Sequence, residues 1–215
     1  MTTAIQPEQG FSHDGTVPRP PVAGALVYLV MNLGVGIAGF VALVTLFAVG
    51  AGTALVWVGL PVLALAVLLC RGGAQVERAR VYALLDTYIA VPHAPLPEKG
   101  RWKARVRDGA TWRSCAYFIL LLPIGIVEFT AMVVLWASAL GLLFLPVYFR
   151  WLPDGSYRLW DWDRPTYVVD STLEALPFAA AGVLVLAVAL VVTRWMGRAH
   201  ARFARGLLGP VGALR

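Results

Sequence analysis

The feature that most constrains the fold is a long stretch, residues 22–69, that contains no aspartate, glutamate, lysine or arginine. As one helix this stretch would be about 72 Å long at roughly 1.5 Å per residue, whereas the hydrocarbon core of a bilayer is about 30 Å thick. The stretch must therefore fold back on itself. Gly50 and Gly52 form the best turn signal within it. We expect two spans, near residues 24–48 and 54–70.

Composition supports a membrane protein rather than a water-soluble one. Hydrophobic residues make up 59% of the chain and charged residues 14%, whereas soluble domains average about 25% charged residues. Two further apolar runs predict spans near residues 114–141 and 173–193. The third could continue to Phe149 or break near Gly141 or Pro146. The sequence thus predicts an all-α membrane protein with four transmembrane helices.

The distribution of basic residues predicts the orientation. Residues 71–113 contain nine lysines and arginines, and five more arginines follow residue 193. Residues 150–172 contain three arginines against four aspartates. Because loops rich in lysine and arginine stay in the cytoplasm, we expect residues 71–113 and both termini to be cytoplasmic and 150–172 to form an outer loop. We expect the plasma (inner) membrane, with residues 1–21 as a disordered tail before a membrane domain at 22–209.

Two basic segments next to the spans are predicted to form amphipathic helices in the headgroup layer. A further amphipathic helix is expected from Arg71 onward, where Val76, Ala79 and Ala83 share one face and Glu77 and Arg80 lie away from it. Basic side chains near spans typically contact anionic lipid headgroups, which we favour over nucleic acid as the partner. The predicted lipid-facing residues are Arg101, Lys103, Arg105, Arg107, Arg198, Arg202 and Arg205.

The chain also contains an internal repeat. An offset of 89 aligns residues 28–52 with 117–141 and gives nine identities, among them Tyr28/Tyr117, Gly36/Gly125 and Phe40/Phe129. Each half would be a helical hairpin followed by a cytoplasmic amphipathic helix. The halves would then be parallel repeats, an arrangement found in transporters and in simple duplications.

Few residues are candidates for chemistry. Glu128 is the only ionisable acid or base well inside a span, where a charge costs about 3 kcal/mol. It is either a packing carboxyl bonded to another helix or part of a sensing or proton-linked site. A second candidate is the outer-loop surface, whose aromatic and acidic side chains either anchor the loop at the interface or bind a ligand: Trp160, Asp161, Trp162 and Asp163.

The sequence contains no nucleotide-binding, hydrolase or zinc-protease motif, and His13, His93 and His200 have no partnered spacing. We therefore expect neither an enzyme nor a bound cofactor or metal.

Five short motifs together resemble those of a known family. They are Gly59-Leu-Pro-Val, Glu77-Arg-Ala-Arg, Trp112-Arg113, Leu122-Pro-Ile-Gly125 and Leu145-Pro-Val-Tyr148. Over residues 22–209 the chain resembles the putative sensor domain of actinobacteria, which forms the membrane-embedded N-terminus of two-component histidine kinases. The resemblance carries over no site residues. Because the sequence ends at Arg215, we expect a sensor without a kinase transmitter.

The leading hypothesis is a stand-alone membrane sensor-like or accessory protein. It would relay a signal from the membrane or the outer face to a separate kinase, regulator or transporter, or to a second copy of the chain. The alternatives are a small transporter or permease subunit with Glu128 in a proton-linked pathway, and a structural membrane protein without a ligand.

Overall fold

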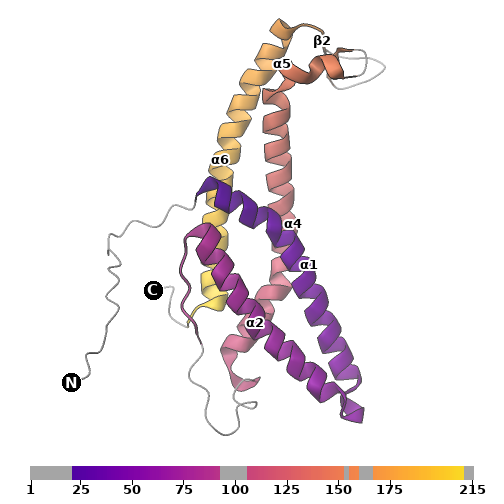
Figure 1. Ribbon diagram of the computed structural model, residues 1–215, viewed down its shortest axis with the longest axis vertical. Coiled ribbons are helices and arrows are strands. Elements are labelled where there is room, and N and C mark those ends of the chain that lie inside the picture. Colours follow the sequence, from indigo (N-terminus) through magenta and orange to yellow (C-terminus); the bar gives the residue numbers. More distant parts are fainter. Residues whose placement is uncertain (1–20, 93–105, 153–154, 160–166, 211–215) are drawn as a thin grey trace, which may run out of the picture.

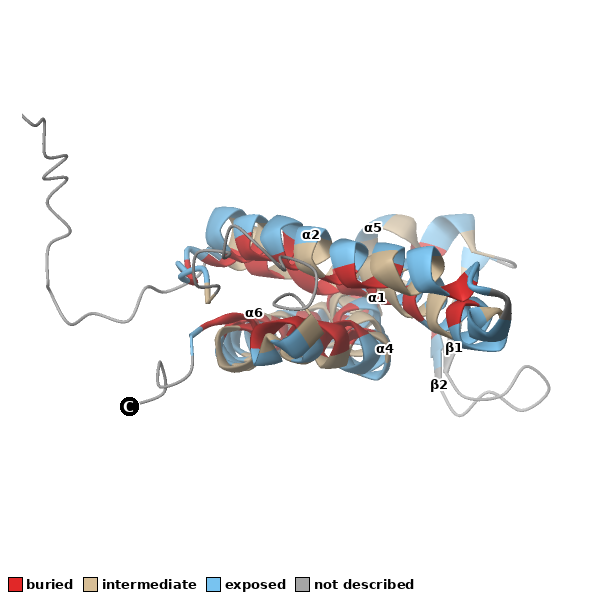
Figure 2. Cartoon of the chain, turned by 90° about the horizontal axis from the view of Figure 1, so that it is seen from below, coloured by how far each residue is buried: buried red, intermediate tan, exposed pale blue. Residues whose placement is uncertain are grey.

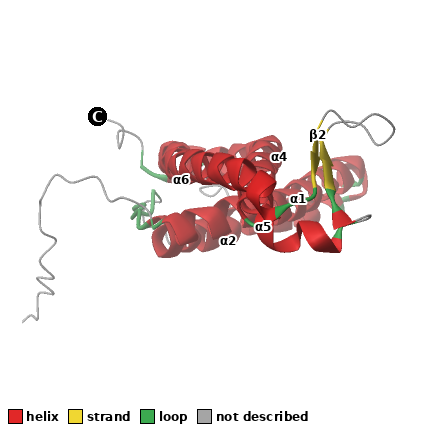
Figure 3. Ribbon diagram, turned by 90° about the horizontal axis from the view of Figure 1, so that it is seen from above, coloured by secondary structure: helices red, strands yellow, loops and turns green. Residues whose placement is uncertain are grey.

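The computed structural model describes residues 21–92, 106–152, 155–159 and 167–210. Residues 1–20 of the predicted tail lie outside these residues, as do the predicted outer-loop surface and Arg101, Lys103 and Arg105. Within them the chain is helical except for one pair of short strands and the loops and turns between elements (Figure 3).

Four long helices are each long and apolar enough to cross a membrane, as the composition predicted. They are α1 (Val22–Gly52), α2 (Gly59–Leu85), α4 (Gly109–Leu143) and α6 (Thr172–Leu208). All four extend beyond the predicted spans. The separate amphipathic helices predicted after the second and fourth spans are wrong, since α2 and α6 continue through those residues without a break. Hydropathy marks only the most apolar part of a helix, whereas alanine, leucine and arginine are good helix formers that continue the helix beyond it.

The turn between α1 and α2 comes later than predicted, because Gly50 and Gly52 still belong to the last turn of α1. A 3-10 turn, Ala54–Val56, follows α1, and Trp57 then adopts a left-handed backbone with φ 65° before α2 begins. Gly59 has no room for a side chain, because a Cβ there would lie 2.1 Å from the carbonyl oxygen of Gly50. The second span therefore starts at residue 59 rather than 54.

The third span does break, between the two predicted positions. Helix α4 ends at Leu143, and a short helix α5 (Leu145–Tyr148) follows with Pro146 in its first turn, where proline is well tolerated. Beyond it, β1 (Tyr157–Leu159) pairs antiparallel with β2 (Tyr167–Val169). Ser171 then caps α6 by accepting a hydrogen bond from the Glu174 N–H.

The long helices form two hairpins that stack as two layers, α1–α2 against α4–α6 (Figure 2). Helices α1 and α4 approach closely at two glycines. A Cβ at Gly36 would lie 3.0 Å from the Leu121 carbonyl oxygen, and one at Gly125 would lie 2.9 Å from the Asn32 carbonyl oxygen. These contacts are reciprocal under the offset of 89, since Gly36 corresponds to Gly125 and Asn32 corresponds to Leu121.

The α1–α2 turn and the α5 end of the other hairpin lie at opposite ends of the long axis (Figure 1). A parallel repeat would place both on the same side of the membrane. The parallel arrangement and the cytoplasmic location of the termini therefore stay predictions.

Candidate functional site

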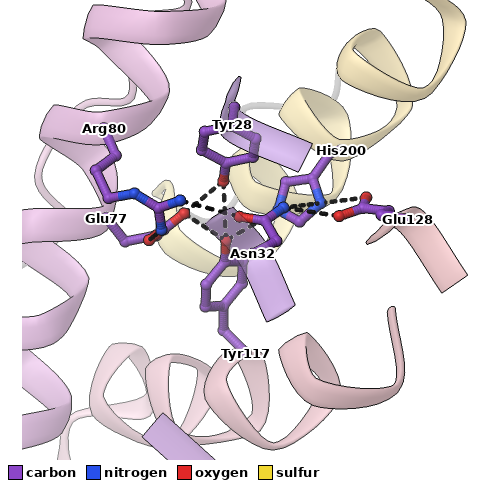
Figure 4. A network of polar contacts seen from close by, with 7 residues as sticks. All are labelled: Tyr28, Asn32, Glu77, Arg80, Tyr117, Glu128 and His200. Atoms are coloured by element: carbon purple, nitrogen blue, oxygen red, sulfur yellow. Dashed lines mark hydrogen bonds and ion pairs between the residues drawn. The ribbon is translucent and has the colours of Figure 1, made fainter. Parts of the chain in front are cut away.

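A buried network of seven polar side chains lies where the two hairpins cross, and all four long helices contribute to it (Figure 4). Tyr28 and Asn32 are four residues apart on α1, so they share one helix face. Helix α2 supplies Glu77 and Arg80, α4 supplies Tyr117 and Glu128, and α6 supplies His200. Arg80 is partly buried, and the other six are buried.

Glu77 is the centre of one half of the network. It is only 1% exposed. The Tyr28 hydroxyl and the Tyr117 hydroxyl, the latter at 3.0 Å, both donate to its Oε1 atom. Arg80 Nη1 donates to Oε2 at 2.6 Å, and the Arg80 guanidinium lies 4.8 Å from the centroid of the Tyr28 ring. Both carboxylate oxygens are thus paired, as a buried charge requires.

Glu128 is the centre of the other half. His200 Nδ1 lies 2.6 Å from its Oε1 atom, and Asn32 Nδ2 donates to Oε2 at 2.7 Å. Asn32 also joins the halves, because its Oδ1 atom accepts a hydrogen bond from Arg80 Nη2 at 3.1 Å. Its Nδ2 atom lies 3.3 Å from His200 Nδ1. A second connection runs from His200 Nε2 to the Tyr117 hydroxyl at 3.1 Å.

The number of protons on His200 determines which of these hydrogen bonds can form together. Tyr117 has one hydroxyl hydrogen. When it donates to Glu77, the hydroxyl oxygen needs a hydrogen from His200 Nε2, while His200 Nδ1 needs one to bond Glu128. Only the doubly protonated imidazolium supplies both. A neutral imidazole must give up one of three hydrogen bonds: its own bond to Glu128, its own bond to Tyr117, or the Tyr117–Glu77 bond.

The charges of the network depend on the same proton. With both carboxylates ionised, Arg80 contributes one positive charge, and Glu77 and Glu128 contribute two negative charges. The seven residues therefore carry a net charge of −1 with a neutral His200 and zero with an imidazolium. Because an uncompensated charge is costly in a buried, low-dielectric setting, the network has room for one additional positive charge.

Among the predicted site residues, Glu128 lies inside this network, on the α4 face that contacts α1 and α6. Arg107, Arg198 and Arg202 are exposed and Arg205 is partly buried; their contact with lipid stays a prediction. Among the described residues, no three histidine, cysteine, aspartate or glutamate side chains come together as metal ligands would.

Sequence reasoning missed the other six residues. Glu77 is buried, whereas Val76 on the apolar face of the same helix is 62% exposed. In a membrane the apolar face can point to lipid, so polar residues that need partners point inward. The absence of a partnered spacing for His200 was also misleading, because its partner Glu128 is 72 positions away. The signals that could have found these residues are an asparagine inside the first span and the Tyr28/Tyr117 repeat pair.

A shallow groove of about 370 Å³ runs between α4 and α6 beside the network, and Glu128 lines it together with Trp195 and Met196. A larger, almost wholly apolar groove of about 870 Å³ lies between the α1–α2 hairpin and the start of α4, where Phe47 stacks on Trp112.

A family model described as "Putative sensor" matches residues 28–208, a range that includes all seven network residues. No curated protein and no solved structure matches the chain.

Proposed function

The chain belongs to the Putative sensor family, and on that basis we propose that it is a membrane sensor whose switch is the seven-residue network. The observation that carries this proposal is that one buried network takes side chains from all four long helices and can exist in two hydrogen-bonding states that differ by one proton. A change of state would break a contact between helices, so it would change how they pack. We assign it no catalytic reaction.

Helix α6 is the best candidate for passing the change on. It runs unbroken from Thr172, beside the outer-loop strands, through His200 to Leu208. Its last residues are held by two arginines. Arg78 Nη1 donates to the Leu208 carbonyl at 3.3 Å, and Arg113 Nη2 donates to the Gly209 carbonyl at 2.6 Å. A movement of His200 would therefore reach the end that we predict to be cytoplasmic. There a separate kinase, regulator or transporter, or a second copy of the chain, would respond.

We also propose that the network arose by duplication. The repeat partners Tyr28 and Tyr117 have hydroxyl oxygens 3.4 Å apart, and both donate to the same oxygen of Glu77. The repeat partners Gly36 and Gly125 form the reciprocal α1–α4 contacts. Both observations fit two copies of one hairpin that meet about an approximate twofold axis.

The test is a distance measurement in lipid nanodiscs. Spin labels at two exposed positions, Ala79 on α2 and Arg198 on α6, would report the α2–α6 separation between pH 5 and 9, with Cys70 and Cys115 replaced. We expect two distance populations that exchange with pH in the wild type. His200→Gln should keep a single population, because it cannot take up the proton. The same pH response in His200→Gln as in the wild type would refute the proposal.

The transporter alternative is supported by the contacts between Glu128, His200, Tyr117 and Glu77, which could pass a proton. It requires net proton movement across the membrane. Proton flux into proteoliposomes that depends on Glu128 would favour it, whereas a switch predicts conformational change without flux.

A further inference from the structure

The groove between α4 and α6 opens beside Glu128. With a neutral His200, the negative charge of Glu128 has no cation bonded to it. The lining of the groove is apolar or aromatic except for Glu128, and it includes Ile124, Val127, Trp195 and Met196. Val127 and Trp195 are 65% and 62% exposed. In a bilayer these side chains would face lipid, so a molecule could enter the groove sideways from the membrane.

Glu128 brings a buried acid to this apolar surface. The residue is 5% exposed, and its two oxygens each accept one hydrogen bond from inside the bundle. A carboxylate can accept about four, so it retains capacity for a partner on the groove side. With a neutral His200 the network also lacks one positive charge. The missing charge can be a proton on His200 or a cation in the groove.

The chemistry of the groove selects the kind of cation. A hard metal ion such as Ca²⁺ needs six or more oxygen ligands, and the groove offers one carboxylate. An organic ammonium needs only a nearby negative charge and an aromatic face, and Trp195 supplies that face. Met196 and Val127 would contact an apolar tail. The volume of about 370 Å³ is within the usual range for small-molecule sites, about 300–1,000 Å³.

We propose that this groove binds a lipophilic ammonium ion, with its head beside Glu128 and Trp195 and its tail along α4 and α6, in competition with the proton on His200. The proposal rests on the proposed function, because it names a chemical input to the same switch. The groups that surround His200 in this competition are Tyr28 and Asn32 from α1, Glu77 and Arg80 from α2, and Tyr117 and Glu128 from α4.

The sign of the pH dependence follows from charge balance. A cation in the groove and a proton on His200 compete for the one positive charge that the network lacks. Binding of a permanently charged cation should therefore tighten with pH, by at most tenfold per pH unit for one competing proton.

The experiment is calorimetric titration of the full chain in nanodiscs with octyltrimethylammonium, with empty nanodiscs subtracted and octanol as the uncharged probe of equal chain length. We expect saturable binding of one octyltrimethylammonium per chain, tighter at pH 8 than at pH 6, and no saturable octanol binding. Glu128→Gln should weaken binding at least tenfold. Trp195→Ala should weaken it about 3- to 30-fold, the range of a cation–π contact.

Two more variants distinguish binding in the groove from the pH-dependent change in the network. Val127→Trp fills the groove from the lipid side without touching the network, so it should abolish binding while leaving the pH-dependent distance change intact. His200→Gln should keep binding but lose its pH dependence. Wild-type binding that is absent, or that survives in both Glu128→Gln and Val127→Trp, would overturn the groove assignment. In that case an intact wild-type distance change would leave the proposed function standing.

Discussion

At the scale of single residues, Tyr28 and Tyr117 provide a natural matched pair. Each donates one hydrogen bond to Glu77, but only Tyr117 also contacts His200 Nε2. We predict that Tyr117→Phe weakens the coupling of α2 to the protonation of His200, because it removes the shorter of the two connections between the imidazole and Glu77 and leaves the one through Asn32 and Arg80. Tyr28→Phe loses a comparable hydrogen bond and should keep the coupling. The α2–α6 label distance as a function of pH measures both, and equal responses of the two variants would contradict the assignment.

Asn32 tests how much the network contributes to stability. Asn32→Leu removes the partner of Arg80 Nη2 and of Glu128 Oε2 at once. Individual hydrogen bonds between membrane helices contribute about 0.6 kcal/mol on average, whereas leaving a buried polar group unpaired costs about 1–3 kcal/mol. We therefore expect a loss of roughly 2–5 kcal/mol in the free energy of unfolding, measured by denaturant titration in mixed micelles. Met31→Leu, at an exposed neighbouring position, should change it by less than about 0.5 kcal/mol.

The network also shows what the sequence can reveal about single residues. Glu128 could be predicted because a carboxylate inside an apolar run stands out in a linear sequence. Its partners could not, because Asn32 and His200 are 96 and 72 positions away and only the packing of three helices brings them together. Glu77 could not be recognised as a buried residue, because an amphipathic pattern does not state whether water or lipid lies outside the helix.

At the scale of secondary-structure elements, the existence of four helices follows directly from the apolar runs, whereas their ends do not. Helix α2 ends at Leu85, where Asp86 takes a left-handed backbone with φ 49°. No glycine marks that position, and asparagine or aspartate is the next most tolerant residue type. The break after Leu143 shifted from both predicted positions because Pro146 fits the first turn of α5 and so need not be the break itself.

The α1–α4 contact gives the element-scale prediction. Alanine at Gly36 or Gly125 would bring a Cβ within about 3 Å of backbone atoms on the other helix, so the helices must separate. We expect each variant to lose about 1–3 kcal/mol of stability and to weaken the pH response of the adjacent network. Gly34→Ala is the control, because nothing lies within 4 Å of a Cβ there and alanine favours a helix by up to about 1 kcal/mol. Thermal unfolding in detergent compares the three, and a loss at Gly34 equal to that at Gly36 would exclude close packing as the cause.

At the scale of the whole molecule, the outward surface of the long helices is largely apolar. Exposed leucine, valine and tryptophan side chains follow all four of them, and such a continuous surface would be insoluble in water. A bilayer is the solvent that accommodates it. The hairpins meet where Gly36 lies against Leu121 and Gly125 lies against Asn32, and Asn32 belongs to the network, so we expect a change in the network to alter the angle between the two layers.

Because of that geometry, the most informative property of the whole molecule is which side of the membrane each of the two hairpin ends faces. The basic residues predict that the α1–α2 turn and the segment after α5 both face outward, although they lie at opposite ends of the long axis (Figure 1). For both ends to reach the same surface, the hairpins must tilt or close towards each other about the glycine contact. We therefore predict that single cysteines at Leu55 and Gly155, both exposed, react with a membrane-impermeant maleimide from outside intact cells. A cysteine at Arg198 should react only after the cells are opened. Labelling of Leu55 and Gly155 from different sides would rule out the parallel repeat and leave the network as the junction of two oppositely oriented hairpins.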